Sequence, residues 1–218
     1  MGPNSGHVQR RARLNTYVSV VWGGVASGKG ELTRRLSAEG EHVIISTSDE
    51  IRKHQARMSP SERILVIAQM KAGKLYDDLK MIDLLDRRLE EVGEVSSIIL
   101  DGFPRNSYQA AHFIEAMVDS GRYRLGSIML LELKRETARK RFFGRMEKED
   151  RLDNDEKVFD DRFDEFEKLL VPMMKYFTEI AKVKVDIVDA EKDEAGVEAQ
   201  ARTILSRRLS LPTLSAAR

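Results

Sequence analysis

Short apolar runs alternate with longer segments of helical periodicity along most of the chain. Five runs rich in β-branched and large apolar residues predict strands. They cover residues 16–22, 42–47, 96–101, 127–133 and 183–188. Between them, apolar residues recur every three or four positions, which predicts helices. The predicted helices cover residues 28–40, 60–73, 77–92 and 107–120, a basic segment ending near 145, a stripe from 159 to 177, and residues 194–209.

The alternation of strands and helices determines the fold class. Several strands are apolar throughout, as strands are in a parallel sheet that is covered on both faces. We therefore predict an α/β fold in three layers, α/β/α, around a five-stranded parallel sheet. Local signals refine the boundaries: Ser48-Asp49 predicts a helix cap, residues 59–62 (SPSE) predict a capping box, and Pro172 predicts a bend or an interruption of the helix around it.

Composition and charge exclude several classes. The chain has 218 residues, 41% hydrophobic and 33% charged, which suits a globular domain rather than a disordered or fibrous chain. The absence of cysteine excludes disulfides, thiolate zinc sites and a catalytic thiol. A formal net charge of +1 gives no overall attraction to nucleic acid or membrane. No apolar stretch approaches the roughly 20 residues that a membrane span needs.

The two ends differ from the middle of the chain. Residues 1–15 carry Arg10, Arg11 and Arg13 and no acidic residue. We expect a flexible basic tail there; the remnant of an expression tag and a short transit-like peptide are the alternatives. Residues 210–218 are expected to form a second tail. The folded domain is therefore placed at residues 16–209.

Residues 23–30 (GGVASGKG) match the pattern G-x-x-x-x-G-K between a predicted strand and a predicted helix. Small residues let successive backbone N–H groups turn towards an anion, and the helix N-terminus adds partial positive charge. Lys29 adds a positive charge that can reach the outer phosphates of a nucleotide. A glycine-rich turn without a ligand is the alternative, but the strand and helix on either side favour a phosphate-binding loop.

Four blocks in order resemble adenylate kinases and related nucleoside monophosphate kinases. The loop ends in Gly-Lys-Gly, as theirs does. Residues 45–52 (ISTSDEIR) resemble the family's I-S-T-G-D-x-x-R, and residues 101–105 (DGFPR) with Gln109 resemble D-G-[FY]-P-R-x-x-x-Q. Later arginines fall at the spacing of the family's lid and the helix after it. The resemblance runs from about residue 18 to 209 and implies a P-loop NTPase-type fold with two insertions, an acceptor-binding segment at about 46–75 and a short lid at about 145–154.

The resemblance implies that the loop holds the phosphates of ATP, the phosphoryl donor. The implied ATP-binding residues are Gly24, Ala26, Ser27, Gly28, Lys29, Gly30, Glu31, Arg141 and Arg145. Asp101 ends an apolar strand, where an isolated carboxylate is costly. The family implies that Asp101 lies near Mg²⁺, generally through water. An aspartate that caps a helix or binds a loop is the alternative.

The resemblance also implies a second pocket, for a nucleoside monophosphate. Arg52 and Arg105 can clamp an α-phosphate through paired N–H donors. Gln109 offers a donor and an acceptor to a purine edge, and because adenylate kinases have glutamine here, AMP is the expected acceptor. Asn106 matches the P-R-N of the pyrimidine kinases, so UMP or CMP remains an alternative. The implied AMP-binding residues are Thr47, Arg52, Gly102, Arg105, Gln109, Arg151 and Arg162.

Phosphoryl transfer requires mainly positioning and electrostatic stabilisation from the protein, so none of the four histidines is assigned a role. The implied catalytic residues are Lys29, Arg105, Arg145, Arg151 and Arg162. The basic segment from Arg135 to Arg151 also fits a solvent-exposed face paired with nearby acids, or a short nucleic-acid patch. Its few aromatic residues disfavour the nucleic-acid patch.

The chain departs from the family pattern in the loop. Val25-Ala26 stands where Pro-Gly is usual, and alanine adopts left-handed backbone geometry less freely than glycine. Glu31 stands where threonine is usual, and its carboxylate would repel a phosphate unless it points away. Ser48 replaces a glycine, and Asn154 replaces an aspartate of the lid. These changes bear on donor affinity, with reduced activity or a changed donor preference as the expected consequences, while the mechanism stays in place.

The expected activity is Mg²⁺-dependent transfer of the γ-phosphoryl group of ATP to AMP, which gives two molecules of ADP. The alternatives are a kinase for UMP, CMP or another monophosphate, a P-loop kinase for a small metabolite, and a nucleotide-binding module that has lost catalysis. No nucleic-acid or membrane partner is expected. The chain is expected to act as a monomer in the cytoplasm.

Overall fold

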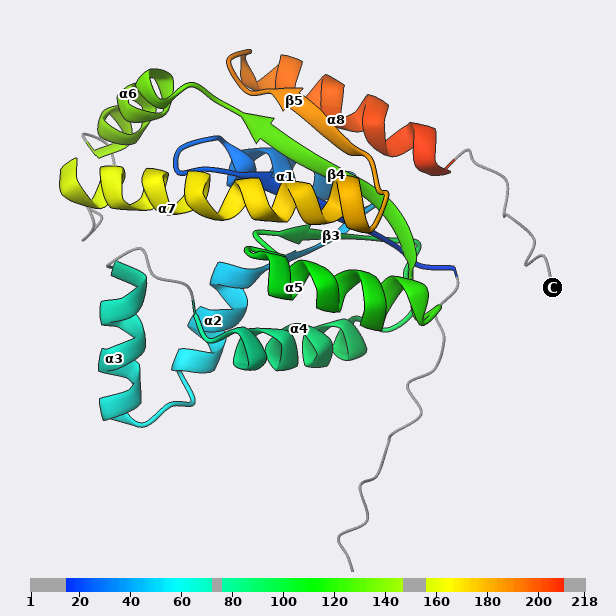
Figure 1. Cartoon of the computed structure of the whole chain (residues 1–218), viewed down its shortest axis with the longest axis horizontal. Coiled ribbons are helices and arrows are strands. Elements are labelled where there is room, and N and C mark those ends of the chain that lie inside the picture. The colour runs from blue at the N-terminus through cyan, green and yellow to red at the C-terminus, as the bar shows by residue number, and fades with distance from the viewer. Residues whose placement is uncertain (1–14, 72–75, 147–155, 210–218) are drawn as a thin grey trace, which may run out of the picture.

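Five parallel strands form one sheet in the order β2-β3-β1-β4-β5 (Figure 1). The strands are β1 (Tyr17–Gly23), β2 (Val43–Ser46), β3 (Ser97–Asp101), β4 (Arg124–Glu132) and β5 (Val185–Asp189). The structure is a computed structural model and describes residues 15–71, 76–146 and 156–209. In the central strand β1, Val20 lies opposite Leu100 of β3 and Ile128 of β4. The five predicted strands and their parallel arrangement are confirmed.

Helices connect the strands and cover both faces of the sheet (Figure 1). They are α1 (Lys29–Ser37), α2 (Thr47–Gln55), α3 (Pro60–Lys71), α4 (Asp78–Val92), α5 (Ser107–His112), α6 (Arg135–Met146), α7 (Glu156–Lys175) and α8 (Glu194–Leu209). A π-helical segment follows α5 at Phe113–Asp119, and another follows α7 at Tyr176–Ile180. Within the described ranges, no helix is both long enough and apolar enough to cross a membrane.

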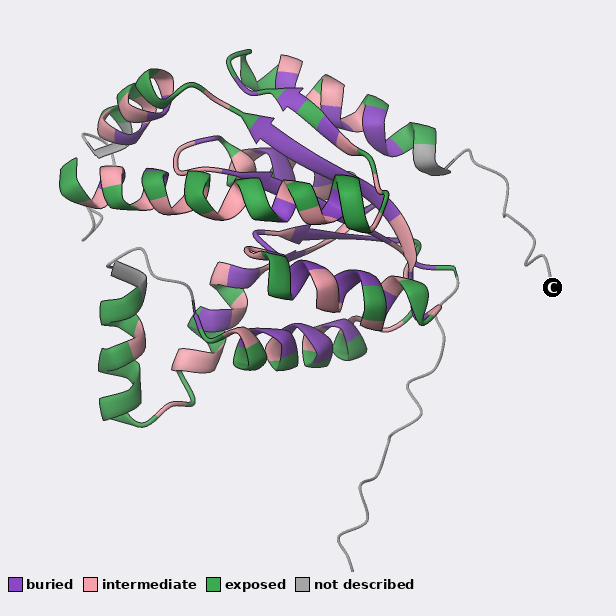
Figure 2. Ribbon diagram, in the orientation of Figure 1, coloured by how far each residue is buried: buried purple, intermediate pink, exposed green. Residues whose placement is uncertain are grey.

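Alternate residues of each strand point to opposite faces of the sheet, which creates two separate cores. Val20 and Trp22 belong to the core beneath α2, α4, α5 and α7, which Phe113 and Phe177 fill. Val21 belongs to the core beneath α1 and α8, together with Leu36. Figure 2 shows the strands as largely buried, and α4 and α5 as buried on the side towards the sheet, whereas no described residue of α3 is buried. The predicted three layers are therefore confirmed.

The predicted helix cap at Ser48-Asp49 is wrong, and so is the predicted interruption at Pro172; the bend predicted there stays a prediction. α2 begins at Thr47, directly after β2, and the residue before it, Ser46, makes no side-chain cap bond. Ser48 and Asp49 therefore lie inside the first turn and do not precede the helix. Pro172 lies within α7, which continues to Lys175. Because Pro172 is exposed, the carbonyl that loses its partner can turn to water, and the helix is not interrupted.

The predicted capping box is confirmed at the start of α3. The Ser59 N–H donates to the Glu62 carboxylate at 3.1 Å, and the Glu62 N–H donates to the Ser59 hydroxyl at 3.4 Å. Other predicted segments lie outside the described residues: residues 1–14 of the N-terminal tail, 72–75 of the acceptor-binding segment, 147–155 in and after the lid, and the tail 210–218.

Candidate active site

The carboxyl ends of three neighbouring strands bring most of the predicted site residues to one edge of the sheet. β1 ends at Gly23, where the phosphate loop begins, β2 ends next to Thr47, and β3 ends at Asp101. Asp101 lies in register with Val21 of β1 and with Ser46 of β2. In an open parallel sheet, ligands bind outside these carboxyl ends. The location therefore suits a ligand site.

The loop after β1 has the curled backbone of an anion-binding turn. Ala26 has a φ of 58° and Gly28 a φ of 87°, both left-handed, and Gly28 is the N-cap residue of α1. Such a turn directs successive N–H groups inward, next to the positive end of the helix. The ammonium of Lys29 donates to the carbonyls of Gly23 and Gly24, at 3.2 Å for Gly24. The loop therefore holds a positive charge against its own backbone.

Ser27 contributes a buried polar group to the loop. Its hydroxyl has no hydrogen-bond partner among the residues that the structure describes. A Cβ atom on Gly23 would lie 2.5 Å from the Ser27 hydroxyl oxygen and 3.1 Å from Cβ of Leu131, so only glycine fits at this position. A buried hydroxyl without a partner is costly. A ligand with oxygen acceptors, such as a phosphate, would provide the partner.

The unusual pair Val25-Ala26 packs against an aromatic cluster between α6 and α7. The buried members of this cluster are Ala138, Phe142, Phe159 and Phe163. A left-handed alanine costs about 1–2 kcal/mol relative to ordinary backbone geometry. Burial of apolar side chains offsets such a cost at about 0.8 kcal/mol per methylene-sized group. Val25 and Ala26, which stand where Pro-Gly is usual, thus attach the tip of the loop to α6 and α7, the helices on either side of the predicted lid.

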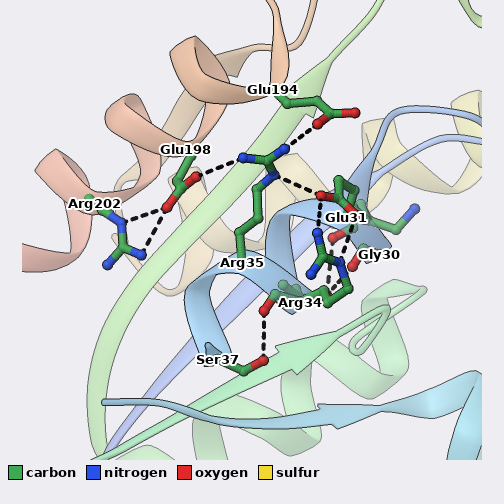
Figure 3. A network of polar contacts seen from close by, with 10 residues as sticks. Gly30, Glu31, Arg34, Arg35, Ser37, Glu194, Glu198 and Arg202 are labelled. Carbon is green, nitrogen blue, oxygen red and sulfur yellow. Dashed lines mark hydrogen bonds and ion pairs between the residues drawn. The ribbon is translucent and has the colours of Figure 1, made fainter. Parts of the chain in front are cut away.

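The carboxylate of Glu31 is turned towards two arginines of its own helix (Figure 3). It accepts from Nε of Arg34 at 2.9 Å and from Nε of Arg35 at 2.7 Å. Arg35 also pairs with Glu194 and Glu198 at the start of α8. These hydrogen bonds lower the pKa of Glu31 from its ordinary value of 4.5 to about 2. The carboxylate of Glu31 is therefore held by this network. Its backbone N–H belongs to the first turn of α1, where N–H groups have no partner within the helix and can bind a phosphate.

A cluster of buried and partly buried charges lies beside the loop. Burial raises the pKa of Asp101, while Lys29 and Arg105 act in the opposite direction. Burial lowers the pKa of Arg105, and the nearby positive charge of Arg162, on α7, lowers it further. The charge of Asp101 therefore interacts at this edge with a cluster of three cations that come from other segments: Lys29, Arg105 and Arg162. Such a cluster favours an anionic ligand.

Thr47, Gly102 and Arg105 form a compact group next to this cluster. Nε of Arg105 donates to the carbonyl of Gly102 at 2.8 Å, and Nη2 donates to the hydroxyl of Thr47 at 3.2 Å. The Thr47 hydroxyl lies 3.2 Å from the same carbonyl. Gly102 has a φ of 78°, and a Cβ atom there would lie 2.9 Å from the Thr47 oxygen and 3.0 Å from Nη2 of Arg105. Position 102 therefore requires glycine for two reasons: its φ is positive, and there is no room for a Cβ atom.

Arg52 does not share this buried position. Its side chain is 62% exposed, and it pairs with Asp49 one turn earlier on α2. Arg105, in contrast, is fixed by the bonds just described. Of the two arginines predicted to clamp a phosphate together, only Arg105 lies in the charge cluster in this structure.

The amide of Gln109 is bound on both sides by the protein. Its Nε2 donates to the carboxylate of Asp78 at 2.7 Å, and its Oε1 accepts from the N–H of Arg105 at 2.8 Å. Asn106 caps α5 by accepting from the Gln109 N–H at 2.9 Å and also donates to Asp78. Asp78 was not predicted as a site residue, because an acid at the start of a helix resembles an ordinary cap.

On the other side of the loop, α6 meets the segment between β5 and α8. Nη2 of Arg141 lies 3.5 Å from the carbonyl of Lys192. The carboxylate of Glu191 accepts from the N–H of Lys134 and from the hydroxyl of Thr137, both at 2.8 Å. Glu191 thus fixes the start of α6 against this segment. Sequence reasoning missed it because its partners are more than fifty positions away.

Two predicted arginines cannot be placed against the cluster. Arg145 lies near the end of α6, but its side chain is outside the described residues, and Arg151 is outside them entirely. Gly24 and Gly30 lie where predicted, in the loop and in the first turn of α1. A Cβ atom on Gly24 would approach the ring of Phe166 on α7 to 3.1 Å, whereas Gly30 has open space.

The donor groups at this edge fit a metal that arrives with a nucleotide. Among the described residues, no group of three or more His, Cys, Asp or Glu side chains could hold a metal ion by itself. Asp101 offers one partly buried carboxylate beside the loop. Mg²⁺ is usually held by one or two carboxylates together with water and substrate phosphates. Asp101 therefore suits Mg²⁺ bound to a nucleotide better than a metal held by protein ligands alone.

The sheet order, the loop and the charge cluster define a P-loop protein of the α/β class. The family model for adenylate kinase matches residues 21–182. An adenylate kinase of Maricaulis maris is 33% identical over 165 residues, which cover 76% of this chain and 87% of that protein. An adenylate kinase of Thermus thermophilus is 32% identical over 152 residues, covering 69% of this chain and 77% of that protein. Human adenylate kinase isoenzyme 5 is 26% identical over 183 residues, which cover 84% of this chain but 31% of that protein.

The chain therefore belongs to the adenylate kinase family. It is a phosphotransferase of the nucleoside monophosphate kinase type, a class that uses ATP as the phosphoryl donor.

Titration of Glu31 tests the network in Figure 3. Because its pKa is lowered from 4.5 to about 2, its contribution to stability is full above pH 4.5 and is lost as the pH falls towards 2. NMR titration of the side-chain carboxyl carbon should give a midpoint near 2. The midpoint should return towards 4.5 when Arg34 and Arg35 are both replaced by alanine. A midpoint near 4.5 in the unaltered protein would contradict the described orientation of Glu31.

Gly102→Ala tests the tight group around Arg105, and Gly93→Ala is its matched control. Both residues have a positive φ, so each substitution strains the backbone and should lower the free energy of unfolding by about 1–3 kcal/mol. Only the Cβ atom at position 102 meets the protein, since nothing lies within 4 Å at position 93. Displacement of Arg105 should raise KM for the monophosphate about tenfold or more, while Gly93→Ala leaves KM unchanged. Urea unfolding and steady-state kinetics measure both quantities; equal KM values for the two variants would refute this account.

Proposed function

We propose that the chain catalyses Mg²⁺-dependent transfer of the γ-phosphoryl group of ATP to AMP, giving two molecules of ADP. The observation that carries the proposal is the presence of two cationic regions side by side at one sheet edge. One is the phosphate loop with Lys29, and the other is the group of Thr47, Gly102 and Arg105. Asp101 lies between them at the end of β3.

In this proposal the loop binds the triphosphate of ATP. Its backbone N–H groups and the Ser27 hydroxyl bind phosphate oxygens, and Lys29 exchanges its carbonyl partners for the outer phosphates. The base of ATP lies against Arg141 and the segment around Lys192, where Glu191 keeps α6 in place. Asp101 would hold Mg²⁺ beside these phosphates. When bound, this ion neutralises charge on the donor phosphates.

The acceptor phosphate binds at Arg105 and Thr47. The guanidinium of Arg105 has donors left after its bonds to Gly102 and Thr47, and its planar fork suits two oxygens of one phosphate. Arg52 joins it by leaving Asp49. Gln109 reads the base. AMP is the proposed acceptor because adenylate kinases have glutamine at this position, and the donor and the acceptor that remain on the Gln109 amide can match an adenine edge.

During transfer the protein positions the two nucleotides and stabilises charge on the moving group. Arg162 lies close enough to Arg105 for its positive charge to lower the pKa of Arg105, and an anion between the two would relieve that repulsion. Arg145 and Arg151 would complete this set from the lid at about 145–154. Closing of the lid and of the acceptor segment at about 46–75 excludes water, which competes as an acceptor.

Asn106 suggested the pyrimidine alternative, and it has a structural role beside Gln109. Its carbonyl oxygen accepts from the N–H of Gln109, and its amide nitrogen donates to Asp78. This role as a helix cap that supports Gln109 is consistent with glutamine as the residue that reads the base.

Formation of ADP in a panel of acceptors tests the proposal. With ATP and Mg²⁺, AMP should give the highest kcat/KM, UMP and CMP much lower values, and a chelator should abolish the reaction. Arg105→Ala should lower kcat/KM for AMP about a hundredfold or more, the scale expected for loss of a donor to the transition state.

Arg87→Ala is the control for this substitution. Arg87 is an exposed arginine on α4 that pairs with Asp83, so its loss should leave kcat/KM within about twofold. Absence of AMP-dependent ADP formation at micromolar enzyme would refute AMP as the acceptor. Equal kinetics of the Arg105→Ala and Arg87→Ala variants would show that the acceptor site lies elsewhere.

A further inference from the structure

Two partners of fixed and opposite polarity hold the amide of Gln109. The backbone N–H of Arg105 can only donate, and it lies 2.8 Å from Oε1. The carboxylate of Asp78 accepts, and it lies 2.7 Å from Nε2. A turn of the amide by 180° would place oxygen against carboxylate and NH₂ against N–H, and both bonds would be lost. The amide therefore has one allowed orientation.

Asp78 is itself held in place. It is the first residue of α4, where a negative charge is favoured. Nδ2 of Asn106 donates to both of its carboxylate oxygens, at 2.9 and 3.0 Å. Gln109 is only 2% exposed, so water does not compete easily for the same bonds. The network joins α4 to α5 and excludes the alternative amide orientation.

A fixed amide distinguishes two purine bases that differ mainly in polarity. The amide of Gln109 has two N–H donors and two acceptor lone pairs. Asp78 uses one donor and Arg105 uses one lone pair, so one donor and one lone pair remain for a base. Adenine presents an amino donor beside a ring-nitrogen acceptor, whereas hypoxanthine presents a carbonyl acceptor beside a ring N–H donor. An amide that can turn freely can hydrogen-bond to the edge of either adenine or hypoxanthine. An amide with one fixed orientation can hydrogen-bond to only one of these two edges.

We infer that Asp78 is the residue that sets purine specificity at the acceptor site, by holding the Gln109 amide in the orientation that suits adenine. The inference rests on the proposed function, in which Gln109 reads the acceptor base. Asp78 does not contact the base; it is a positioning residue that acts through Gln109.

The test is Asp78→Asn, with Asp83→Asn as the matched control. Asparagine can donate as well as accept, so at position 78 it offers a partner to either orientation of the Gln109 amide, and only the N–H of Arg105 then opposes the turned orientation. The measured quantity is kcat/KM for AMP divided by kcat/KM for inosine monophosphate, at saturating ATP and Mg²⁺. Loss of one of the two bonds that orient the amide should lower this ratio about fivefold. Asp83 lies on the same helix with its side chain 55% exposed, and its substitution should leave the ratio unchanged.

A double-mutant cycle separates positioning from a purely structural role. If Asp78 acts through Gln109, Asp78→Asn should not change the ratio further in the Gln109→Ala background. A structural role would lower kcat/KM for both acceptors equally and leave the ratio as it was. Thermal unfolding checks that each variant is folded. Asp78→Ser, whose hydroxyl also donates and accepts, provides the same comparison if Asp78→Asn does not fold.

The unaltered protein distinguishes failure of this inference from failure of the proposed function. Absence of AMP phosphorylation would overturn both. Phosphorylation of AMP and inosine monophosphate at equal rates, or a folded Asp78→Asn variant whose ratio stays within about twofold of the unaltered protein, would overturn the inference alone.

Discussion

The burial of charge at the end of β3 constrains the rest of the site. Asp101 and Arg105 are both withdrawn from water, and burial works against the charged form of each. A buried charge is tolerated only when an opposite charge or hydrogen bonds compensate for it. Lys29 and Arg105 supply that compensation for Asp101. Arg162 adds a further positive charge, so the cluster attracts an anion that can lie between its cations.

The features that surround this cluster serve to keep it in place. Gly102 allows Arg105 to fold back onto its own backbone and onto Thr47. The loop brings Lys29 to the same edge from β1. The unusual loop residues are each accommodated by a contact elsewhere: Ala26 packs on the aromatic cluster of α6 and α7, and Glu31 is bound by arginines of α1. The departures from the family pattern are therefore accompanied by contacts that support the loop from α1, α6 and α7.

Much of the fold could be predicted from the sequence, because it depends on local patterns. Apolar strands, helical periodicity and the capping box of Ser59 all have local signatures. The residues that the cluster brings together, such as Lys29 and Arg105, were found through motifs that follow predicted strands. Contacts between distant segments carry no such signature. The exposed position of Arg52, the role of Asp78 and the contact of Glu191 with α6 depend on how helices pack.

The apolar pattern predicted α3 correctly but carried no information about what covers this helix. Ile64 and Leu65 of α3 fit helical spacing, but their exposed fractions are 67% and 65%. Helical spacing of apolar residues predicts a helix, but it does not predict whether other elements bury those residues. The same limit applies to Pro172, whose effect depends on whether its helix face meets water.

The central claim is that a triphosphate pocket and a monophosphate pocket meet across this charge cluster. A crystal structure with a bisubstrate dinucleotide, two adenosines joined by five phosphates, tests it most directly. We predict one adenine base beside Gln109 with the nearest phosphate at Thr47 and Arg105, the other base beside Arg141, and the ammonium of Lys29 moved from the carbonyl of Gly24 onto a phosphate. A ligand that left either pocket empty while bound elsewhere on the protein would contradict the account.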